Sequence, residues 1–314
     1  MKVKDVFQDV MLVVGCIVGV SFVTGKEAQT FVGNGKNIAL FAIVFATCAI
    51  VLQRFCAKWQ LHTTEQFVHF AFKKWGYVVH FLLLACFFVC IVTTLATVQS
   101  SMHQVAGSIP FPLWSAIVVT LSAMVLKGGV NAFKVVSIMA FVGTFITFVL
   151  VSASQNVQQS SDINPISTVL YSLFSLTMVL PVCCKTAKKS TKQNVLCVVF
   201  ATIVVALLLW WVERVADFSQ TLPIGGNLSG VGKVLLCVTI CLCGISGVVA
   251  NALPLCQGLG DVIPDKKLLT FVVLALAWAF GCFGLDILLK YGYLFVAIVG
   301  LVIVVRCLFA TKAC

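Results

Sequence analysis

The sequence predicts an all-α polytopic membrane protein with ten transmembrane helices. Of its 314 residues, 61% are hydrophobic and 10% are charged, and its mean hydropathy is +1.11. A soluble domain of this length needs far more polar surface. The hydrophobic residues gather in runs close to the length of about 20 residues that a helix needs to cross a bilayer. We therefore interpret residues 1–314 as one membrane-embedded domain whose main partner is the lipid bilayer.

Turn signals and charged residues separate the predicted spans. The polar start MKVKDVFQDV leads straight into the first apolar run without a small-residue cleavage site. We therefore expect this first span to stay in the mature protein and not to be removed as a signal peptide. The predicted spans cover residues 6–32, 37–57, 77–104, 112–127, 131–153, 165–184, 193–213, 232–253, 267–284 and 287–309.

Basic residues predict the orientation of the spans. With a cytoplasmic N-terminus, 16 of the 21 Lys and Arg residues fall in cytoplasmic segments, as the positive-inside rule requires. We therefore place both termini in the cytoplasm and the protein in the cytoplasmic membrane. The net charge of +11 is then a topology signal, and we expect no nucleic acid partner. After the second span, Thr64 as N-cap and the apolar Phe67, Phe70 and Ala71 predict a short helix at the cytoplasmic interface.

Cysteines and histidines give no sign of a cofactor or a catalytic metal. The 15 cysteines lie mostly inside apolar runs and form no C-x-x-C pair, and the four histidines have no metal-ligand spacing. We interpret the cysteines as buried or lipid-facing apolar residues. No G-x-S-x-G or H-E-x-x-H motif is present either, so the sequence does not favour a membrane enzyme.

The first span carries polar and glycine residues where lipid disfavours both. In VGCIVGVSFVTGKEAQTF, residues 14–31, three glycines precede an adjacent lysine and glutamate. Opened backbone inside a membrane is tolerated only where protein or a water-filled cavity satisfies its amides. We therefore predict a break near Val20–Val23. Thr24 and Glu27 have capping-box spacing, which predicts that a second half-helix begins in mid-span and offers free amides to an anion.

Alternative interpretations stay open for the glycines and Glu27 of this segment and for two threonines of span three. Gly15 and Gly19 are four residues apart, a spacing typical of close packing between membrane helices. Glu27 is either a structural cap that faces an outer vestibule or a carboxylate that couples transport to protons, because an acid inside the membrane is a functional candidate. Thr93 and Thr97 in span three either line a site or form ordinary hydrogen bonds between helices.

Span six is the predicted counterpart of span one. Discontinuous helices in transporters come in pairs at corresponding positions of two inverted repeats, and span six lies five spans after span one. Its centre carries Tyr171, Ser172 and Ser175, and Pro181 lies near its end. We therefore predict that helices one and six are both discontinuous.

The span-one pattern, with Gly15, Gly19, Ser21, Phe22, Thr24, Gly25 and Glu27, resembles the glycine-rich signature of the YkvI family of bacterial membrane proteins. The YSLFS segment that begins at Tyr171 and the closing segment 283–301 are similar to later signatures of that family. The resemblance implies a LeuT-type five-plus-five inverted repeat of the amino acid, polyamine and organocation superfamily, with repeats at about 6–153 and 165–309. It also implies the activity of an amino acid permease.

The same resemblance implies where a sodium ion would bind. The ligands would be the carbonyls of Gly15, Val18 and Cys243 and the hydroxyl of Ser246. The next position, Gly247, supplies no hydroxyl, so we expect weak sodium dependence and leave proton coupling, or no coupling ion, open.

The leading hypothesis is a secondary active transporter of a small amino-acid-like or other carboxylate-bearing solute. The alternatives are a receptor or assembly subunit that retains the fold without transport and, third, a membrane enzyme. The sequence leaves the oligomeric state open. The predicted substrate-binding residues are Gly19, Ser21, Phe22, Thr24, Gly25, Glu27, Thr93, Thr97, Tyr171, Ser172 and Ser175.

Overall fold

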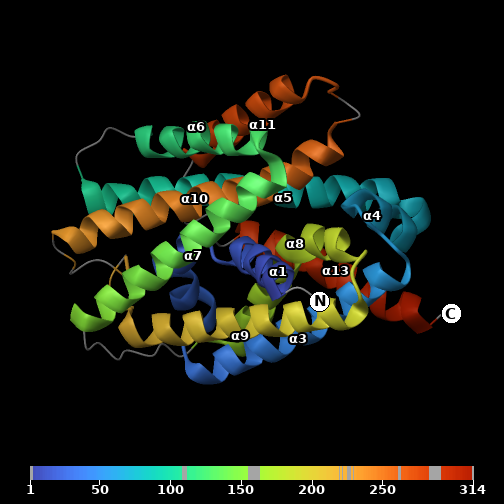
Figure 1. Cartoon of the computed structure of the whole chain (residues 1–314), viewed down its shortest axis with the longest axis horizontal. Coiled ribbons are helices and arrows are strands. Elements are labelled where there is room, and N and C mark those ends of the chain that lie inside the picture. The colour runs from blue at the N-terminus through green and yellow to red at the C-terminus, as the bar shows by residue number, and fades with distance from the viewer. Residues whose placement is uncertain are drawn as a thin grey trace.

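The computed structural model describes residues 3–107, 112–154, 163–218, 220, 222–224, 228, 230–260, 263–282 and 291–312, and this part of the chain is helical without strands. Each of the ten predicted spans contains helix, although residues 283–290 of the ninth and tenth lie outside the described residues. The elements, shown in Figure 1, are α1 (Val3–Ile17), α2 (Val20–Val23), a π-helical turn (Ala28–Val32), α3 (Gly35–Lys58), α4 (Thr64–Phe72), a 3₁₀ turn (Lys73–Trp75), α5 (Gly76–Ala106), α6 (Leu113–Lys127), α7 (Gly129–Ser154), α8 (Pro165–Thr186), α9 (Thr191–Val215), α10 (Val231–Gly258), α11 (Lys266–Gly281) and α13 (Tyr293–Lys312).

Length and composition agree with a polytopic membrane protein. Six helical segments of the described chain are long and apolar enough to cross a membrane, and they correspond to α3, α4 with α5, α7, α8, α9 and α10. Shorter apolar helices lie at 6–17, 113–127 and 293–309. Large apolar side chains such as Phe81 and Phe271, about 70% exposed, cover the outside of the bundle, because in a membrane the outer surface contacts lipid tails.

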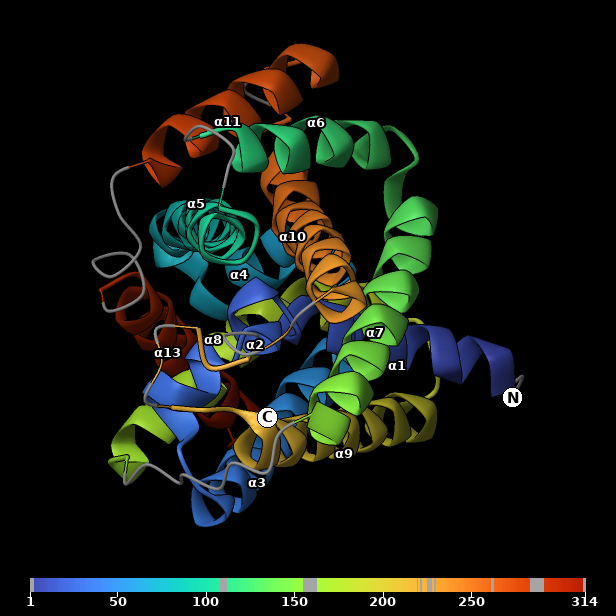
Figure 2. The ribbon, with the colours of Figure 1, turned by 90° about the vertical axis from the view of Figure 1, so that its left-hand side faces the viewer.

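The helices form two packed groups. In the first group, α1, α3, α8 and α9 contact one another, and in the second group α5, α6, α10 and α11 do so. Figure 2 shows the second group as two layers, with α6 and α11 outermost, above the first group. α7 packs against both α1 and α10, and α13 packs against α8 and α5. Span one thus lies between the two groups.

The segments that the charge pattern assigns to the cytoplasm gather at one end of the molecule. Lys189, after α8, pairs with Asp9 near the start of α1. Arg306, near the end of α13, donates to the carbonyl of Ala71 in α4 at 2.5 Å. In Figure 1 this is the end with α4 and the C-terminus. The basic Lys189 and Arg306 thus lie in segments that pack together, and the orientation in the membrane stays a prediction.

The predicted interfacial helix is present, one residue displaced at its cap. α4 buries Phe67 and Ala71, whereas Phe70 is 41% exposed. The N-cap is Thr63 and not Thr64, because the Thr63 side chain accepts a hydrogen bond from the amide of Gln66.

Span one is interrupted, which confirms the prediction from its glycines. α1 ends at Ile17, and the chain leaves the helix at Val18 and Gly19 before α2 occupies the four residues where we expected the break. The helix stops again at Thr24 and Gly25, where Gly25 has a φ of 79°. Side chains other than glycine are strained in this left-handed region. The span therefore crosses the molecule as two halves that α2 joins.

Span six is continuous, so the prediction of a second discontinuous helix is wrong. α8 runs without interruption from Pro165 to Thr186 and includes Pro181. Ser172 and Ser175 each donate a 2.9 Å hydrogen bond to the carbonyl four residues earlier. Hydroxyls bonded in this way are compatible with an unbroken helix, and this segment contains no glycine to open it.

The contact between α8 and α13 yields a packing prediction. A Cβ added at Gly300 of α13 would lie 2.5 Å from the carbonyl oxygen of Leu173 and 2.5 Å from Oγ1 of Thr177. Gly300→Ala must therefore push the two helices apart, and we expect it to lower the free energy of unfolding by about 1–3 kcal/mol. Thermal unfolding of the purified protein in detergent measures the change.

Gly35→Ala is the matched control, because a Cβ there would meet its nearest neighbour, Glu213, at an ordinary 3.7 Å. Alanine also favours helix over glycine, so this variant should melt at or above the wild-type temperature. A Gly300→Ala protein as stable as the wild type would show that α13 does not pack this closely on α8.

Candidate functional site

Polar side chains meet where the broken span one crosses α5. Ser21 is in α2, and its Oγ lies 3.2 Å from Oγ1 of Thr97 in α5. Thr97 in turn donates to the carbonyl of Thr93 one turn earlier, at 2.8 Å. All three side chains are buried. The structure thus brings together three of the predicted site residues, at a contact between the two helix groups.

The backbone of the break has unused hydrogen-bonding groups. Among the described residues, the amides of Val20, Ser21 and Phe22 donate to no backbone carbonyl, as expected for the first residues after a helix break. A Cβ added at Gly19 would meet no heavy atom within 4 Å, whereas one at Gly15 would lie 2.6 Å from Oγ of Ser137. Close packing therefore explains Gly15 but not Gly19, which borders open space beside the free amides.

Glu27 is the centre of a buried hydrogen-bonded cluster. Its Oε2 accepts a hydrogen bond from the hydroxyl of Tyr171 in α8 at 2.6 Å, and its Oε1 accepts one from Tyr293 in α13 at 2.7 Å. All three residues are at least 94% buried. A carboxylate in a membrane interior needs such donors, because burial without them is strongly unfavourable. The two hydroxyls therefore hold span one to α8 and α13.

Aromatic rings enclose this carboxylate. Phe31, in the π-helical turn, stacks on Tyr171 with ring centroids 5.6 Å apart and on Tyr293 with centroids 5.2 Å apart. Phe174 stacks on Tyr293 with centroids 4.0 Å apart. The hydroxyl of Thr168 in α8 donates to the carbonyl of Phe31 at 2.7 Å. The outer half of span one is thus fixed against α8 and α13 by stacked rings as well as by hydrogen bonds.

The predicted capping box is absent. Thr24 ends α2 in helical conformation, and its hydroxyl donates to the carbonyl of Ser21 at 3.3 Å instead of accepting from the amide of Glu27. The Glu27 carboxylate reaches α8 and α13 and not the Thr24 amide, which donates to Val20. The capping box was a local interpretation, and the distant tyrosines offer the carboxylate two hydroxyl donors in a buried site.

The connection between α9 and α10 covers the outer half of span one. The amide of Ile224 donates to the carbonyl of Thr24 at 3.1 Å. The side-chain amide of Gln29 donates to the carbonyl of Phe218 at 2.6 Å. A Cβ added at Gly25 would lie 3.0 Å from Pro223, so this loop packs directly against the second interruption of span one. Together with the Glu27 cluster, the described part of this loop holds the outer half of span one in place.

A cavity lies beside α1, before the break in the sequence. Its volume is about 370 Å³, within the range of small-molecule sites. It lies between α1, α7, α8 and α10 beside the segment that precedes α4, and it extends inward to Cys16, next to the end of α1. Its opening is on the side that the basic residues assign to the cytoplasm. The lining includes Leu12, His62, Phe133, Pro181, Lys185 and Gln257.

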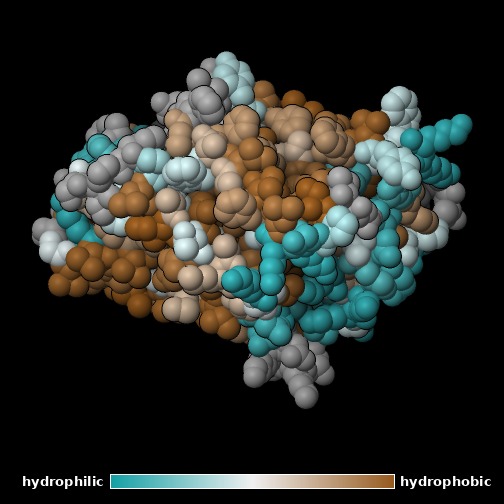
Figure 3. All heavy atoms as spheres, turned by 90° about the horizontal axis from the view of Figure 1, so that it is seen from above, coloured by the Kyte–Doolittle hydropathy of each residue, from teal (hydrophilic) through white to brown (hydrophobic). Residues whose placement is uncertain are grey.

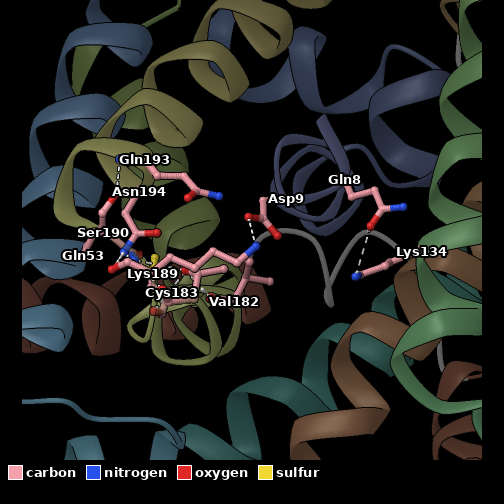
Figure 4. Close-up of polar contacts among 11 residues, drawn as sticks. Gln8, Asp9, Gln53, Lys134, Val182, Cys183, Lys189, Ser190, Gln193 and Asn194 are labelled. Atoms are coloured by element: carbon pink, nitrogen blue, oxygen red, sulfur yellow. Dashed lines mark hydrogen bonds and ion pairs between the residues drawn. The ribbon is translucent and has the colours of Figure 1, made fainter. Parts of the chain in front are cut away.

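Two neighbouring residues hold the inner end of α1 from different sides (Figure 4). Asp9 is buried and pairs with Lys189, after α8, at 2.5 Å. Gln8 accepts a longer contact, 3.5 Å, from Lys134 of α7. The ion pair ties α1 to its own helix group, whereas the longer contact adds to the packing of α1 on α7.

The residues of the implied sodium site lie partly together. A Cβ at Gly15 would be 3.5 Å from Oγ of Ser246, and the carbonyls of Gly15 and Val18 accept no backbone hydrogen bond among the described residues. Cys243 lies one turn before Ser246 in α10, and its Sγ contacts Thr144.

A second hydroxyl lies beside that of Ser246 in the implied sodium site, and it belongs to a residue that the sequence did not indicate. Ser137 of α7 has its Oγ 3.2 Å from that of Ser246. A side chain at position 247 would instead face Thr94 of α5, 3.2 Å from a Cβ placed there. The sequence argument from Gly247 therefore does not describe the hydroxyls that lie near Gly15.

The other predicted substrate-binding residues are buried or bonded within their own helix. Phe22 is buried in the core, and Ser172 and Ser175 donate within α8. Sequence reasoning missed Tyr293 and Phe31. Tyr293 lies in a segment that we used only for the family resemblance, and a tyrosine in an apolar span is the kind of polar residue that needs a buried partner.

Comparison with known proteins identifies the fold. The structure of Mhp1, a nucleobase-cation-symport-1 family transporter with bromovinylhydantoin bound, matches with a TM-score of 0.63 and 13% identity over 90% of this chain and 74% of that chain. MhsT in complex with L-phenylalanine matches with a TM-score of 0.66 and 13% identity over 95% and 87%. A manganese transporter of Eremococcus coleocola matches with a TM-score of 0.57 and 13% identity over 86% and 68%.

These similarities confirm the LeuT-type fold that the family resemblance implied. No protein-family model matches the sequence, and no curated protein matches it either. Membership of the YkvI family therefore stays a prediction.

The Glu27 cluster yields a prediction for stability. Tyr171→Phe and Tyr293→Phe keep the stacked rings but each removes one donor from a buried carboxylate. We expect each to lower the free energy of unfolding by about 1–3 kcal/mol, the scale of an unsatisfied buried group. The losses should shrink in a Glu27→Gln background, because the partner charge is gone.

Thermal unfolding of the purified variants provides the measurement, with Tyr77→Phe as control because Tyr77 is 78% exposed. Equal melting temperatures for all three tyrosine variants would mean that the hydroxyls do not support Glu27.

Proposed function

We propose that this protein is a secondary active transporter that moves a small carboxylate-bearing solute, such as an amino acid, by alternating access, in a chain of two repeats at about 6–153 and 165–309. The observation that carries the proposal is the asymmetry around the break in span one. On the outer side, the Glu27 cluster and the described part of the loop before α10 contact the outer half of span one. On the inner side, a cavity of about 370 Å³ reaches Cys16. Access from one side at a time is what this mechanism requires.

The proposed substrate contacts are centred on the break. The free amides of Val20, Ser21 and Phe22 suit a carboxylate, because they are donors that no backbone carbonyl occupies. Ser21 and Thr97 add hydroxyls within the same polar contact. Two proteins of similar fold hold small organic molecules, bromovinylhydantoin in Mhp1 and L-phenylalanine in MhsT, which supports a substrate of that size.

We propose that Glu27 couples transport to protons. As a carboxylate it accepts hydrogen bonds from two tyrosine hydroxyls, one on each oxygen. A proton on either carboxylate oxygen turns that oxygen into a hydrogen-bond donor. The tyrosine that donated to it must then rotate away or accept a hydrogen bond from it. The hold of span one on α8 and α13 then weakens, which favours opening on the outer side. Proton binding and opening are linked because both act on the same two hydrogen bonds.

Different contacts hold the inner end of α1, where the structure has its cavity. Because the Asp9 and Lys189 ion pair lies within the first helix group, α1 keeps its connection to the segment between α8 and α9 when that group moves. Movement of α1 away from α7 breaks the contact between Gln8 and Lys134, 3.5 Å long, and loosens the packing of Gly15 on Ser137. The two groups can therefore rock against each other without loss of a buried ion pair.

Uptake into proteoliposomes tests the proposal. A thermal-shift screen against amino acids and small carboxylates first identifies a ligand, because a ligand that binds the folded state raises the melting temperature. With that ligand, the purified protein should accumulate substrate against its gradient when the outside is acidic, with or without sodium. Glu27→Gln should still exchange substrate across the membrane but lose uphill accumulation.

Glu213→Gln is the control, since Glu213 is an acid at the outer end of α9, outside the cluster. Accumulation that disappears when potassium replaces sodium at fixed pH would contradict proton coupling. Binding without any flux would favour a receptor with the transporter fold.

A further inference from the structure

A second hollow lies on the outside of the molecule, far from the Glu27 cluster. It is a groove of about 1080 Å³ between α6 and α11, the two helices that form the outermost layer in Figure 2. Small residues at helical spacing on α6 and larger apolar residues on α11 shape it. Its main apolar lining residues are Ala116, Ala123, Leu126, Phe271, Leu274 and Trp278.

The groove faces lipid and not water. Around it, Met124 is 61% exposed and Phe271 is 70% exposed, and such apolar surface in a membrane protein contacts acyl chains. Figure 3 looks onto this side of the molecule and shows apolar surface across its middle, with hydrophilic residues gathered toward one end.

One end of the groove is strongly basic. Lys127 ends α6, and Lys266 and Lys267 begin α11, so that three exposed lysines line the same end. None of them forms an ion pair in the part of the chain that the structure describes. The nearby carboxylate of Asp265 is used as the helix cap, because its Oδ1 accepts from the amides of Lys267 and Leu268. The three lysines therefore outnumber the one described carboxylate beside them, and none is paired with it.

The depth of the lysines matches lipid headgroups. α6 has 15 residues and α11 has 16, fewer than the 20 or so that span a bilayer. From Ala116 to Lys127 a helix rises about 16 Å, and one leaflet of the hydrocarbon core is about 15 Å thick. The lysines thus lie about one leaflet away from the apolar end of the groove. Trp278 lines that end, and its Nε1 donates to Oγ of Ser115 at 3.2 Å.

We propose that the groove between α6 and α11 binds an anionic phospholipid from the cytoplasmic leaflet. The phosphate lies among Lys127, Lys266 and Lys267, and an acyl chain lies along the apolar lining. Basic clusters at the cytoplasmic ends of transmembrane helices are suited to such headgroups. Because α11 and α6 belong to the second helix group, a lipid here binds that group alone and does not require movement of the first.

Native mass spectrometry of the full chain in detergent tests the proposal. Phosphatidylglycerol and phosphatidylcholine with the same acyl chains are added in equal amounts, and the retained lipids are counted. The wild type should retain phosphatidylglycerol preferentially. Each lysine removed by Lys127→Ala, Lys266→Ala or Lys267→Ala should weaken its binding about fivefold. Inorganic phosphate should not displace it, because phosphate lacks the acyl chain.

A matched control removes three exposed lysines elsewhere on the same side, by Lys74→Ala, Lys188→Ala and Lys192→Ala, and should keep the lipid. For the apolar part of the groove, Ala275→Trp fills it and should reduce retention. Ala279→Trp, on an exposed position of the same helix outside the lining, should not.

Three results would overturn the proposal. The first is equal retention of the two lipids by the wild type. The second is equal loss when Lys127, Lys266 and Lys267 are replaced together and when the three control lysines are replaced together, which would indicate unspecific charge attraction. The third is a dimer that Ala275→Trp dissociates and Ala279→Trp does not, because a second copy of the chain would then occupy the groove.

Discussion

A carboxylate inside a membrane must find hydrogen-bond donors, and this requirement organises the centre of the protein. Glu27 finds them in Tyr171 and Tyr293, on two helices that are distant in sequence. An unsatisfied charge there would be far more unfavourable than the net gain of an ordinary hydrogen bond. The outer half of span one is therefore fixed against α8 and α13, where the ring of Phe31 stacks on both tyrosines. We infer that this cluster closes the outer side.

The break in span one has the opposite requirement, because it leaves amide donors that need hydrogen-bond acceptors. Such groups are tolerated inside a membrane only beside protein or a polar cavity. The free amides of α2 follow α1, whose Cys16 lines the cavity. A Cβ at Gly19, between Cys16 and these amides in the sequence, would meet no heavy atom within 4 Å. A continuous helix would have no free amides here, so the break supplies the polar backbone that a solute with a charged group requires.

The sequence predicted what depends on local pattern and missed what depends on which distant residues meet. Apolar runs located the ten spans. Glycines indicated that span one is interrupted, but Val20–Val23, where we expected the break, are helical and the interruptions lie on either side of them. The capping box at Thr24 was wrong because spacing along the chain cannot show that two tyrosines compete for Glu27. The predicted break in span six was wrong because Ser172 and Ser175 bond within α8. Ser137 and Tyr293 were missed because no periodicity indicates which side of a fully apolar helix faces the site.

The central claim is that the break separates a closed outer half from a cavity open to the cytoplasm. Reaction of native cysteines with a membrane-impermeant thiol reagent tests it, with the modified positions identified by peptide mass spectrometry. Cys16 lines the cavity, whereas Cys282 is exposed at the end of α11 on the predicted outer side. In oriented vesicles, reagent on the cytoplasmic side should modify Cys16, and reagent on the outer side should modify Cys282 but spare Cys16. Modification of Cys16 from the outer side alone would contradict the account.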